Sequence, residues 1–137
     1  AKGADRPHLL GALGAVQLQG GHTLEARESL REAHKLNPED PAILGNLGMA
    51  QAMGGDLDKA IDTFEDLVRM APDMADAHAQ LGAMQMQAGR QEAGLASLRH
   101  AVELAPEKKA FRKNLGYALQ MVGRNQEAEE QFRKAQE

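Results

Sequence analysis

The chain lacks cysteine and tryptophan altogether, and only 3% of its 137 residues are aromatic. Without cysteine it forms no disulfide, thiolate metal site or catalytic thiol. No apolar run approaches the ~20 residues of a membrane-spanning helix, and no signal peptide is recognisable. The net charge of −4 comes without the clustered lysines and arginines that nucleic-acid-binding surfaces use. We therefore expect no membrane insertion and no nucleic-acid partner, with a soluble, cytoplasmic protein as the default.

Glycine, by contrast, is frequent, and several glycines recur with a period of 34 residues. A leucine–glycine pair and a later glycine return at this spacing, and so does a proline. These markers are Leu13-Gly14, Leu47-Gly48, Leu81-Gly82 and Leu115-Gly116; Gly21, Gly55, Gly89 and Gly123; and Pro38, Pro72 and Pro106. Because three independent markers share one register, the sequence predicts an internal structural repeat.

Each repeat predicts two helices joined by a short turn. The first helix of the second repeat is expected to end at Gly55, which suits a left-handed C-terminal residue. The next helix begins after Asp56, a favourable N-cap, and ends before Pro72. No segment alternates with the period of two that a strand requires. We predict an all-α fold with helices over 7–20, 23–36, 41–54, 57–70, 75–88, 91–104, 109–122 and 125–136.

This pattern resembles the tetratricopeptide repeat family, whose 34-residue unit is a helical hairpin. The resemblance implies a right-handed α-solenoid of stacked antiparallel hairpins. The second helices also carry the small and large residues of the family: Ala26, Ala60, Gly94 and Ala128, and Leu30, Phe64, Leu98 and Phe132. The domain comprises residues 7–137, as units 7–40, 41–74, 75–108 and 109–137, and residues 1–6 are expected to form a flexible leader.

Two features of the repeat carry expectations about packing. Gly48 lies inside a helix, where glycine costs about 1 kcal/mol relative to alanine. We expect it to face the small residue Ala60 of the second helix, so that the two helices approach closely and recover this cost. The family's usual aromatic residues are replaced by Gln17, Gln51 and Gln85, which predicts weaker packing at these places.

Charge separates the two helices of each hairpin. The first helices 7–20 and 41–54 contain no Asp, Glu, Lys or Arg, whereas 23–36 and 57–70 contain six each. An uncharged helix is normally buried on several sides. The first helices are therefore expected to line the inner, concave side of the solenoid. The resemblance implies that partner proteins bind in this groove.

The residues expected on the groove face are small, amide-bearing or methionine. Methionine is flexible and polarizable and suits apolar partners, and amides can hydrogen-bond to a peptide backbone. The candidate partner-binding residues are Ala15, Gly45, Asn46, Met49, Met53, Ala79, Gln80, Ala83, Met86, Gln87, Lys113, Asn114, Tyr117 and Met121. The alternative interpretation is that Met49, Met53 and Met86 only fill gaps between neighbouring repeats.

Other chemistry finds little support in the sequence. The five histidines lack the spacing of a zinc site, and Ser29 and Ser97 have no recognisable base. We expect no catalytic residue, no metal and no cofactor. Some tetratricopeptide domains hold a chaperone's terminal carboxylates with basic and amide side chains. The first possible register for such a clamp places Gly11, Ala15 and Asp76 at three of those positions, so this function is not expected.

The sequence thus predicts a non-catalytic scaffold that binds an apolar helical or extended protein segment. Two alternative functions stay open. In the first, the chain is the recognition region of a larger enzyme, such as a transferase or hydroxylase. In the second, it is a self-assembling adaptor. The second alternative depends on Leu9 and Val16, whose equivalents Ile43 and Ala50 are expected to pack on a preceding repeat. No preceding repeat stands in this sequence, so we expect either that upstream repeats were cut away or that this edge meets another chain, as in a homo-oligomer.

Overall fold

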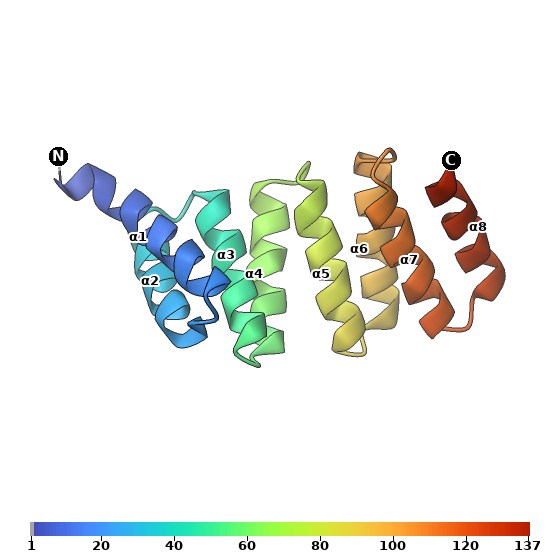
Figure 1. Cartoon of the computed structure of the whole chain (residues 1–137), viewed down its shortest axis with the longest axis horizontal. Helices are drawn as coiled ribbons and strands as arrows, with labels where there is room; N and C mark the ends of the chain where they lie inside the picture. The colour runs from blue at the N-terminus through green and yellow to red at the C-terminus, as the bar shows by residue number, and fades with distance from the viewer. Residues whose placement is uncertain (1) are drawn as a thin grey trace. The chain divides into compact units, whose positions relative to one another are not determined.

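A computed structural model describes the backbone of residues 2–137 and the side chains from Asp5 onward (Figure 1). The described residues form helices and turns and no strand, which confirms the all-α prediction. The helices are α1 (Lys2–Gln19), α2 (Thr23–Leu36), α3 (Pro41–Met53), α4 (Leu57–Met70), α5 (Ala75–Gln87), α6 (Gln91–Leu104), α7 (Lys109–Met121) and α8 (Asn125–Gln136). Apart from the start of α1, every bound lies within one residue of the predicted one.

The start of α1 differs from the expectation. Residues 2–6 are helical instead of forming a flexible leader, and Ala1 lies outside the described residues. Asp5 lies near the positive end of the helix dipole, where a carboxylate is stabilising. Arg6 donates a hydrogen bond to the carboxylate of Glu32 on α2, which ties this turn to the neighbouring helix. These contacts offset the backbone hydrogen bond that Pro7 cannot donate inside the helix.

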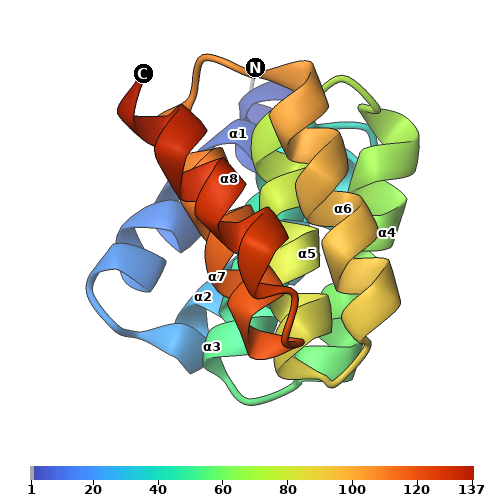
Figure 2. The same ribbon diagram turned by 90° about the vertical axis from the view of Figure 1, so that its right-hand side faces the viewer.

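The chain divides into two compact units, Ala1–Ala71 and Pro72–Glu137. The first unit contains α1–α4 and the second α5–α8, so each consists of two helical hairpins. In the first unit α1 packs on α2 and α3 on α4, while α3 also contacts α1 and α2. In the second unit the equivalent helices make the equivalent contacts, and Figure 2 shows α8 beside α7. The division lies close to the expected boundary between residues 74 and 75.

The turns inside the hairpins form as predicted. Gly55 has a φ of 89°, a left-handed conformation that favours glycine, and the equivalent glycines share it. Asp56 then caps α4, since its carboxylate accepts a hydrogen bond from the backbone N–H of Lys59 at 3.4 Å. At the start of α3, Asp40 likewise accepts from the N–H of Ala42 at 2.9 Å. These two caps stabilise the starts of α3 and α4 where the sequence predicted helices to begin.

The glycine inside each first helix makes room for a large side chain of the second helix, and in the third hairpin it also faces the small residue, since a β-carbon on Gly82 would lie 3.0 Å from the carbonyl oxygen of Gly94. A β-carbon on Gly48 would lie only 2.6 Å from the ring of Phe64. The equivalent closest distances are Gly14–Leu30 2.5 Å, Gly82–Leu98 2.7 Å and Gly116–Phe132 2.6 Å. The large residue of the second helix therefore occupies the volume that a β-carbon would take, and this contact offsets the low helix propensity of glycine.

The glutamines in place of aromatic residues join the two helices of a hairpin by hydrogen bonds. The hydroxyl group of Thr63 donates to Oε1 of Gln51 at 2.6 Å, and both side chains are buried. The same bond is 2.8 Å from Ser29 to Gln17 and 2.7 Å from Ser97 to Gln85. In the fourth hairpin the equivalent of glutamine is the buried Leu119. The expected weakening is thus compensated by a polar pair in three hairpins.

Candidate partner-binding surface

The second unit contains a hollow of about 190 Å³ between α5 and α7. Its lining comes from the facing sides of these two helices and from one residue of α6. The lining residues are Ala83, Met86, Gln87, Leu98, Asn114, Tyr117, Ala118 and Met121. All of them except Leu98 and Ala118 belong to the candidate partner-binding residues. We refer to this cavity as the second-unit hollow.

The floor and the wall of the second-unit hollow differ in burial. Met86 is only 8% exposed, and a β-carbon on Gly94 would lie 2.7 Å from its sulfur. Met86 therefore belongs to the core of this unit while also lining the hollow. Tyr117 is exposed, and its ring meets the edge of the Phe132 ring with centroids 5.1 Å apart. Met121 is 67% exposed, so two large apolar side chains of the wall lie in contact with water.

Polar groups of the second-unit hollow lie at its rim. Gln87 and Asn114 are exposed, and each amide offers both donors and an acceptor. Lys113 precedes Asn114 on α7 and is exposed, but it does not line the hollow. The arrangement is an apolar depression with two amides beside it, which is the usual composition of a site for an apolar ligand group.

The first unit contains a hollow of similar size, about 200 Å³, between α1 and α3. It is lined by His8, Gly11, Ala12, Ala15, Asp40, Ala42, Ile43 and Asn46. Only Ala15 and Asn46 among these are candidate residues. The carboxylate of Asp40, which also caps α3, and the imidazole of His8 make this first-unit hollow more polar than the other.

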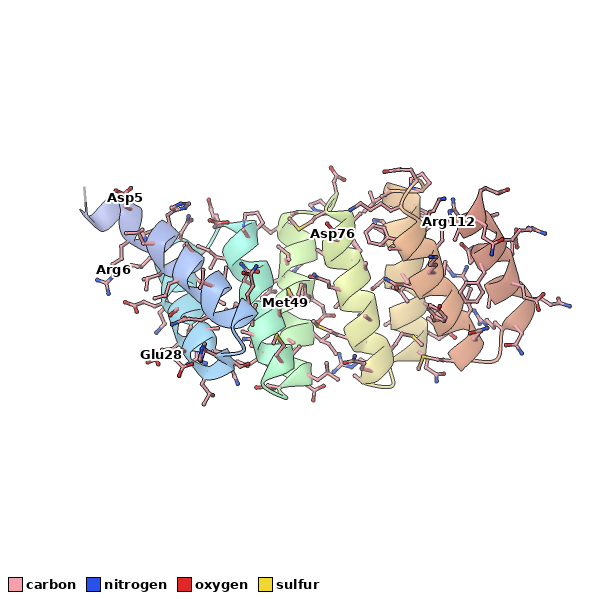
Figure 3. The ribbon with its side chains drawn as sticks, in the orientation of Figure 1. Asp5, Arg6, Glu28, Met49, Asp76 and Arg112 are labelled. Atoms are coloured by element: carbon pink, nitrogen blue, oxygen red, sulfur yellow. The ribbon has the colours of Figure 1, made fainter. Side chains whose placement is uncertain are left out.

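The remaining candidate residues line neither hollow. Met49 of α3 packs against the buried cluster around Leu18 and Leu47 and is half-buried (Figure 3). Ala79 is buried in the core of the second unit. The other four are Gly45, Met53, Gln80 and Lys113. Met53 and Lys113 are exposed, and Gly45 and Gln80 are half-buried.

Sequence reasoning missed two kinds of lining residue. Leu98 was expected only as a large residue of a second helix, and Ala118 and Asp40 were not among the candidate residues. Leu98 is only 2% exposed, like its buried equivalents Leu30 and Phe64, so its repeat position gave no signal that it would line a hollow.

Other possible sites are weaker. An open depression of about 520 Å³ near the end of the second unit is lined by side chains of both charge signs, including Lys109, Arg112, Lys134 and Glu107. Among the described side chains, no three potential metal ligands come together. None of the helices in the described part of the chain has the length and apolarity needed to cross a membrane.

Helical hairpins that repeat every 34 residues and expose apolar hollows on their first helices define a helical-repeat protein. The family model of the tetratricopeptide repeat matches residues 12–75, 55–108 and 85–137. The chain therefore belongs to the tetratricopeptide repeat family. Membership in this family implies a protein–protein interaction scaffold. The sequence matches no curated protein.

Solved structures with the same fold include three informative cases. A crystal structure of MamA aligns with a TM-score of 0.89 at 23% identity, over 96% of this chain and 77% of that chain. A thermophilic tetratricopeptide repeat protein of Thermus thermophilus aligns with a TM-score of 0.81 at 26% identity, over 94% and 72%. A mutant O-GlcNAc transferase of Thermobaculum terrenum aligns with a TM-score of 0.79 at 24% identity, over 87% of this chain but 23% of that chain. These likenesses show the fold.

Proposed function

We propose that the chain is a non-catalytic scaffold that binds an apolar helical or extended segment of a partner protein, with the second-unit hollow as its main anchor. The observation that carries this proposal is the apolar lining of the hollow beside the exposed Tyr117 and Met121. Exposed apolar side chains around a concave surface are typical of ligand and partner sites.

The size of the hollow suits one large apolar side chain of the partner. A volume of about 190 Å³ accommodates a leucine, methionine or phenylalanine side chain. Burying such a side chain contributes about 1.5–3 kcal/mol. Tyr117 and Met121 add contact area, and the amides of Gln87 and Asn114 can hydrogen-bond to the partner's backbone. Because burial dominates, we expect the affinity to change little with salt concentration.

A second candidate function is that the chain forms the partner- or substrate-recognition region of a larger enzyme. The likeness to part of an O-GlcNAc transferase favours this alternative, since that alignment covers 23% of the transferase. The second-unit hollow would bind the same chemistry in either case. The coding sequence of the full-length gene distinguishes the two, because an enzyme would contain a catalytic domain outside residues 1–137.

The proposal is tested with peptides selected from a phage-displayed random library on the wild-type chain. We expect the selected peptides to be enriched in Leu, Met, Ile and Phe. Their affinity, measured by fluorescence polarisation, is expected to fall about 10-fold or more in Tyr117→Ala and Met121→Glu, as for central interface residues. The variants are expected to keep the wild-type circular dichroism spectrum, because both side chains are exposed.

Met53→Glu is the matched control for Met121→Glu. Met53 is the equivalent residue of α3, it is 55% exposed, and it lies outside both hollows. Because Met53 lies outside the proposed site, its substitution is expected to leave the peptide affinity within about twofold of wild type. Selected peptides without apolar enrichment, or wild-type affinity in both second-unit variants, would contradict the proposal.

A further inference from the structure

The first-unit hollow, which the proposed peptide anchor does not use, contains a carboxylate without a cationic partner. Asp40 lines the hollow and is half-buried. One of its oxygens accepts the hydrogen bond from the N–H of Ala42, which leaves the other oxygen available. In the described part of the chain, no lysine or arginine forms an ion pair with Asp40 or with the adjacent Glu39.

The helices that form the first-unit hollow supply no free cation for this carboxylate. Helix α3 contains no charged residue. Arg6 on α1 is the repeat equivalent of Asp40, and its guanidinium donates a hydrogen bond to the carboxylate of Glu32 on α2. The hollow therefore keeps a negative charge that the first unit does not neutralise.

The second unit shows how a cation is held at the equivalent place. The repeat equivalents of Asp40 and His8 are Lys108 and Asp76. The Lys108 ammonium nitrogen lies 3.5 Å from a carboxylate oxygen of Asp76, which is in the first turn of α5 (Figure 3). The same nitrogen lies 5.2 Å from the centroid of the Phe111 ring, and Phe111 is the equivalent of Ile43 in the first-unit hollow. A cation on a carboxylate, above a large apolar residue, is thus already present in one copy of this framework.

The two units differ in where the cation comes from. In the second unit the acid and the cation belong to the same chain, whereas in the first unit only the acid is present. The positive end of a helix dipole disfavours a cation at the start of α3. Lys108 nevertheless occupies the N-cap position of α7, so this place in the framework accepts a positive charge when a carboxylate lies beside it.

The remaining lining of the first-unit hollow suits the long side chain of arginine. The residues around Ile43 are glycine and alanine, which leave room for an aliphatic stem. The amide oxygen of Asn46 can accept a guanidinium N–H, and the imidazole of His8 offers a flat face for stacking. Arginine has five donors for these acceptors, whereas lysine has a compact ammonium group that cannot stack. The volume of about 200 Å³ is sufficient for one such side chain.

We propose that the first-unit hollow binds an arginine side chain of a partner protein, with the guanidinium on Asp40 and Asn46 and the aliphatic stem on Ile43. The inference rests on the proposed function only in taking the ligand to be a protein segment. Because Asp40 is half-buried and the attraction is electrostatic, the affinity of this site should fall as the salt concentration rises. The second-unit hollow, where burial dominates, is expected to change little under the same conditions.

Nuclear magnetic resonance with a blocked amino acid tests the first-unit hollow by itself. N-acetyl-arginine N-methylamide is titrated into the ¹⁵N-labelled chain at low salt. We expect saturable shifts of the backbone amide signals of Gly11, Ala15 and Asn46, whose residues line the hollow. The uncharged N-acetyl-norleucine N-methylamide should bind about 10-fold more weakly or worse, because it lacks the charged donors. The corresponding lysine derivative should lie between the two.

Asp40→Asn removes the charge and keeps the helix cap, since asparagine and aspartate are similarly good N-cap residues. It is expected to weaken the binding of the arginine derivative about 10-fold or more. Glu39→Gln is the matched control, because it removes a carboxylate from the adjacent residue, which does not line the hollow. Its affinity should stay within about twofold of wild type, since an exposed charge outside the site is screened.

The double variant His8→Asp/Asp40→Lys copies the acid and the cation of the second unit into the first. Its lysine should pair with the new aspartate and exclude the arginine derivative, so no saturable shift is expected at Gly11, Ala15 or Asn46. Far-UV circular dichroism of all three variants is expected to match wild type, because the second unit folds with the same pair of residue types at these positions.

Each outcome supports the arginine site or overturns it. The absence of saturable shifts in the wild-type chain overturns it. Equal affinity for the norleucine derivative also overturns it, because the hollow would then be a purely apolar site. Wild-type affinity in Asp40→Asn, or an equal loss in Glu39→Gln, shows that Asp40 does not hold the ligand. None of these results depends on Tyr117 or Met121, so the peptide experiment on the second-unit hollow can fail while this one succeeds, and the reverse.

Discussion

The two compact units are built alike but open at opposite ends of their first helices. In the first unit the hollow lies toward the helix starts, beside His8 and Asp40. In the second unit it lies toward the helix ends, beside Gln87 and Met121. The volumes are similar, about 200 and 190 Å³, but the first hollow carries ionisable groups and the second is mainly apolar.

Single side chains produce this difference. In the first unit Leu18 is buried and Met49 packs on its cluster, so the helix ends are filled. The equivalent residues of the second unit are Met86 and Tyr117, and the Tyr117 ring turns onto Phe132 and leaves a hollow. The comparison teaches that a common repeat framework offers several places for a hollow, and that the residue at each place decides whether the hollow is open.

The largest effect is expected from breaking the framework that the units share. Leu47→Ala and Leu115→Ala each remove a buried side chain and should lower the free energy of unfolding by about 2–5 kcal/mol. Leu13→Ala is the matched control, because the equivalent Leu13 is 47% exposed and should cost less than about 2 kcal/mol. Urea unfolding followed by circular dichroism, at the lowest practical protein concentration, measures all three. If all three variants lost the same unfolding free energy, the expected difference between the buried leucines and the exposed Leu13 would be contradicted.

A smaller effect is expected at the glycines inside the first helices, and it should differ between the units. The three atoms nearest to a β-carbon on Gly48 all belong to the Phe64 ring, the closest at 2.6 Å. One on Gly82 would meet the Leu98 side chain at 2.7 Å and also the carbonyl oxygen of Gly94 at 3.0 Å. Overpacking costs about 1–3 kcal/mol, from which alanine recovers about 1 kcal/mol of helix propensity.

Because backbone moves less readily than a side chain, we expect Gly82→Ala to lower the unfolding free energy more than Gly48→Ala. Thermal and urea unfolding of the two variants provide the measurement. A larger loss in Gly48→Ala would show that the aromatic ring, rather than the backbone of α6, resists the added methyl group.

The smallest expected effect concerns the polar pairs inside the hairpins. Thr63→Val keeps the shape of the side chain but removes the hydroxyl that donates to Gln51. The buried Gln51 oxygen then loses this partner, which should cost about 1–2 kcal/mol. Ser29→Ala should cost less, since the Ser29–Gln17 pair is only part-buried and water can replace the hydroxyl. An unchanged stability of Thr63→Val would show that the pair contributes nothing beyond its shape.

Most of the fold could be predicted because its signals are local and repeated. Left-handed glycines such as Gly55 end the first helices, and Asp56 caps α4, and both are readable from a few neighbouring residues. The prediction failed at residues 2–6, where the contact of Arg6 with Glu32 connects residues far apart in sequence. Repeat spacing alone also did not tell that Phe64, the large residue of the second helix, fills the gap left by Gly48.

The candidate site was less predictable for the same reason. Met49, Met53 and Met121 are all methionines that the sequence placed on the groove face. In the structure, however, Met49 packs on a buried cluster, whereas Met121 lines an open hollow. The outcome depends on neighbours such as Leu18 and Phe132, which belong to other helices.

The sequence by itself determined the repeat, the helix bounds and the separation of charged from uncharged helices, since backbone conformation and periodicity depend on near neighbours. Only the tertiary structure decided which equivalent residue is core and which is surface. Whether Tyr117 opens a hollow, and whether Leu9 and Val16 remain exposed, depends on the volumes that other helices bring against them. Packing is a property of neighbours in space, and a linear pattern does not contain their shapes.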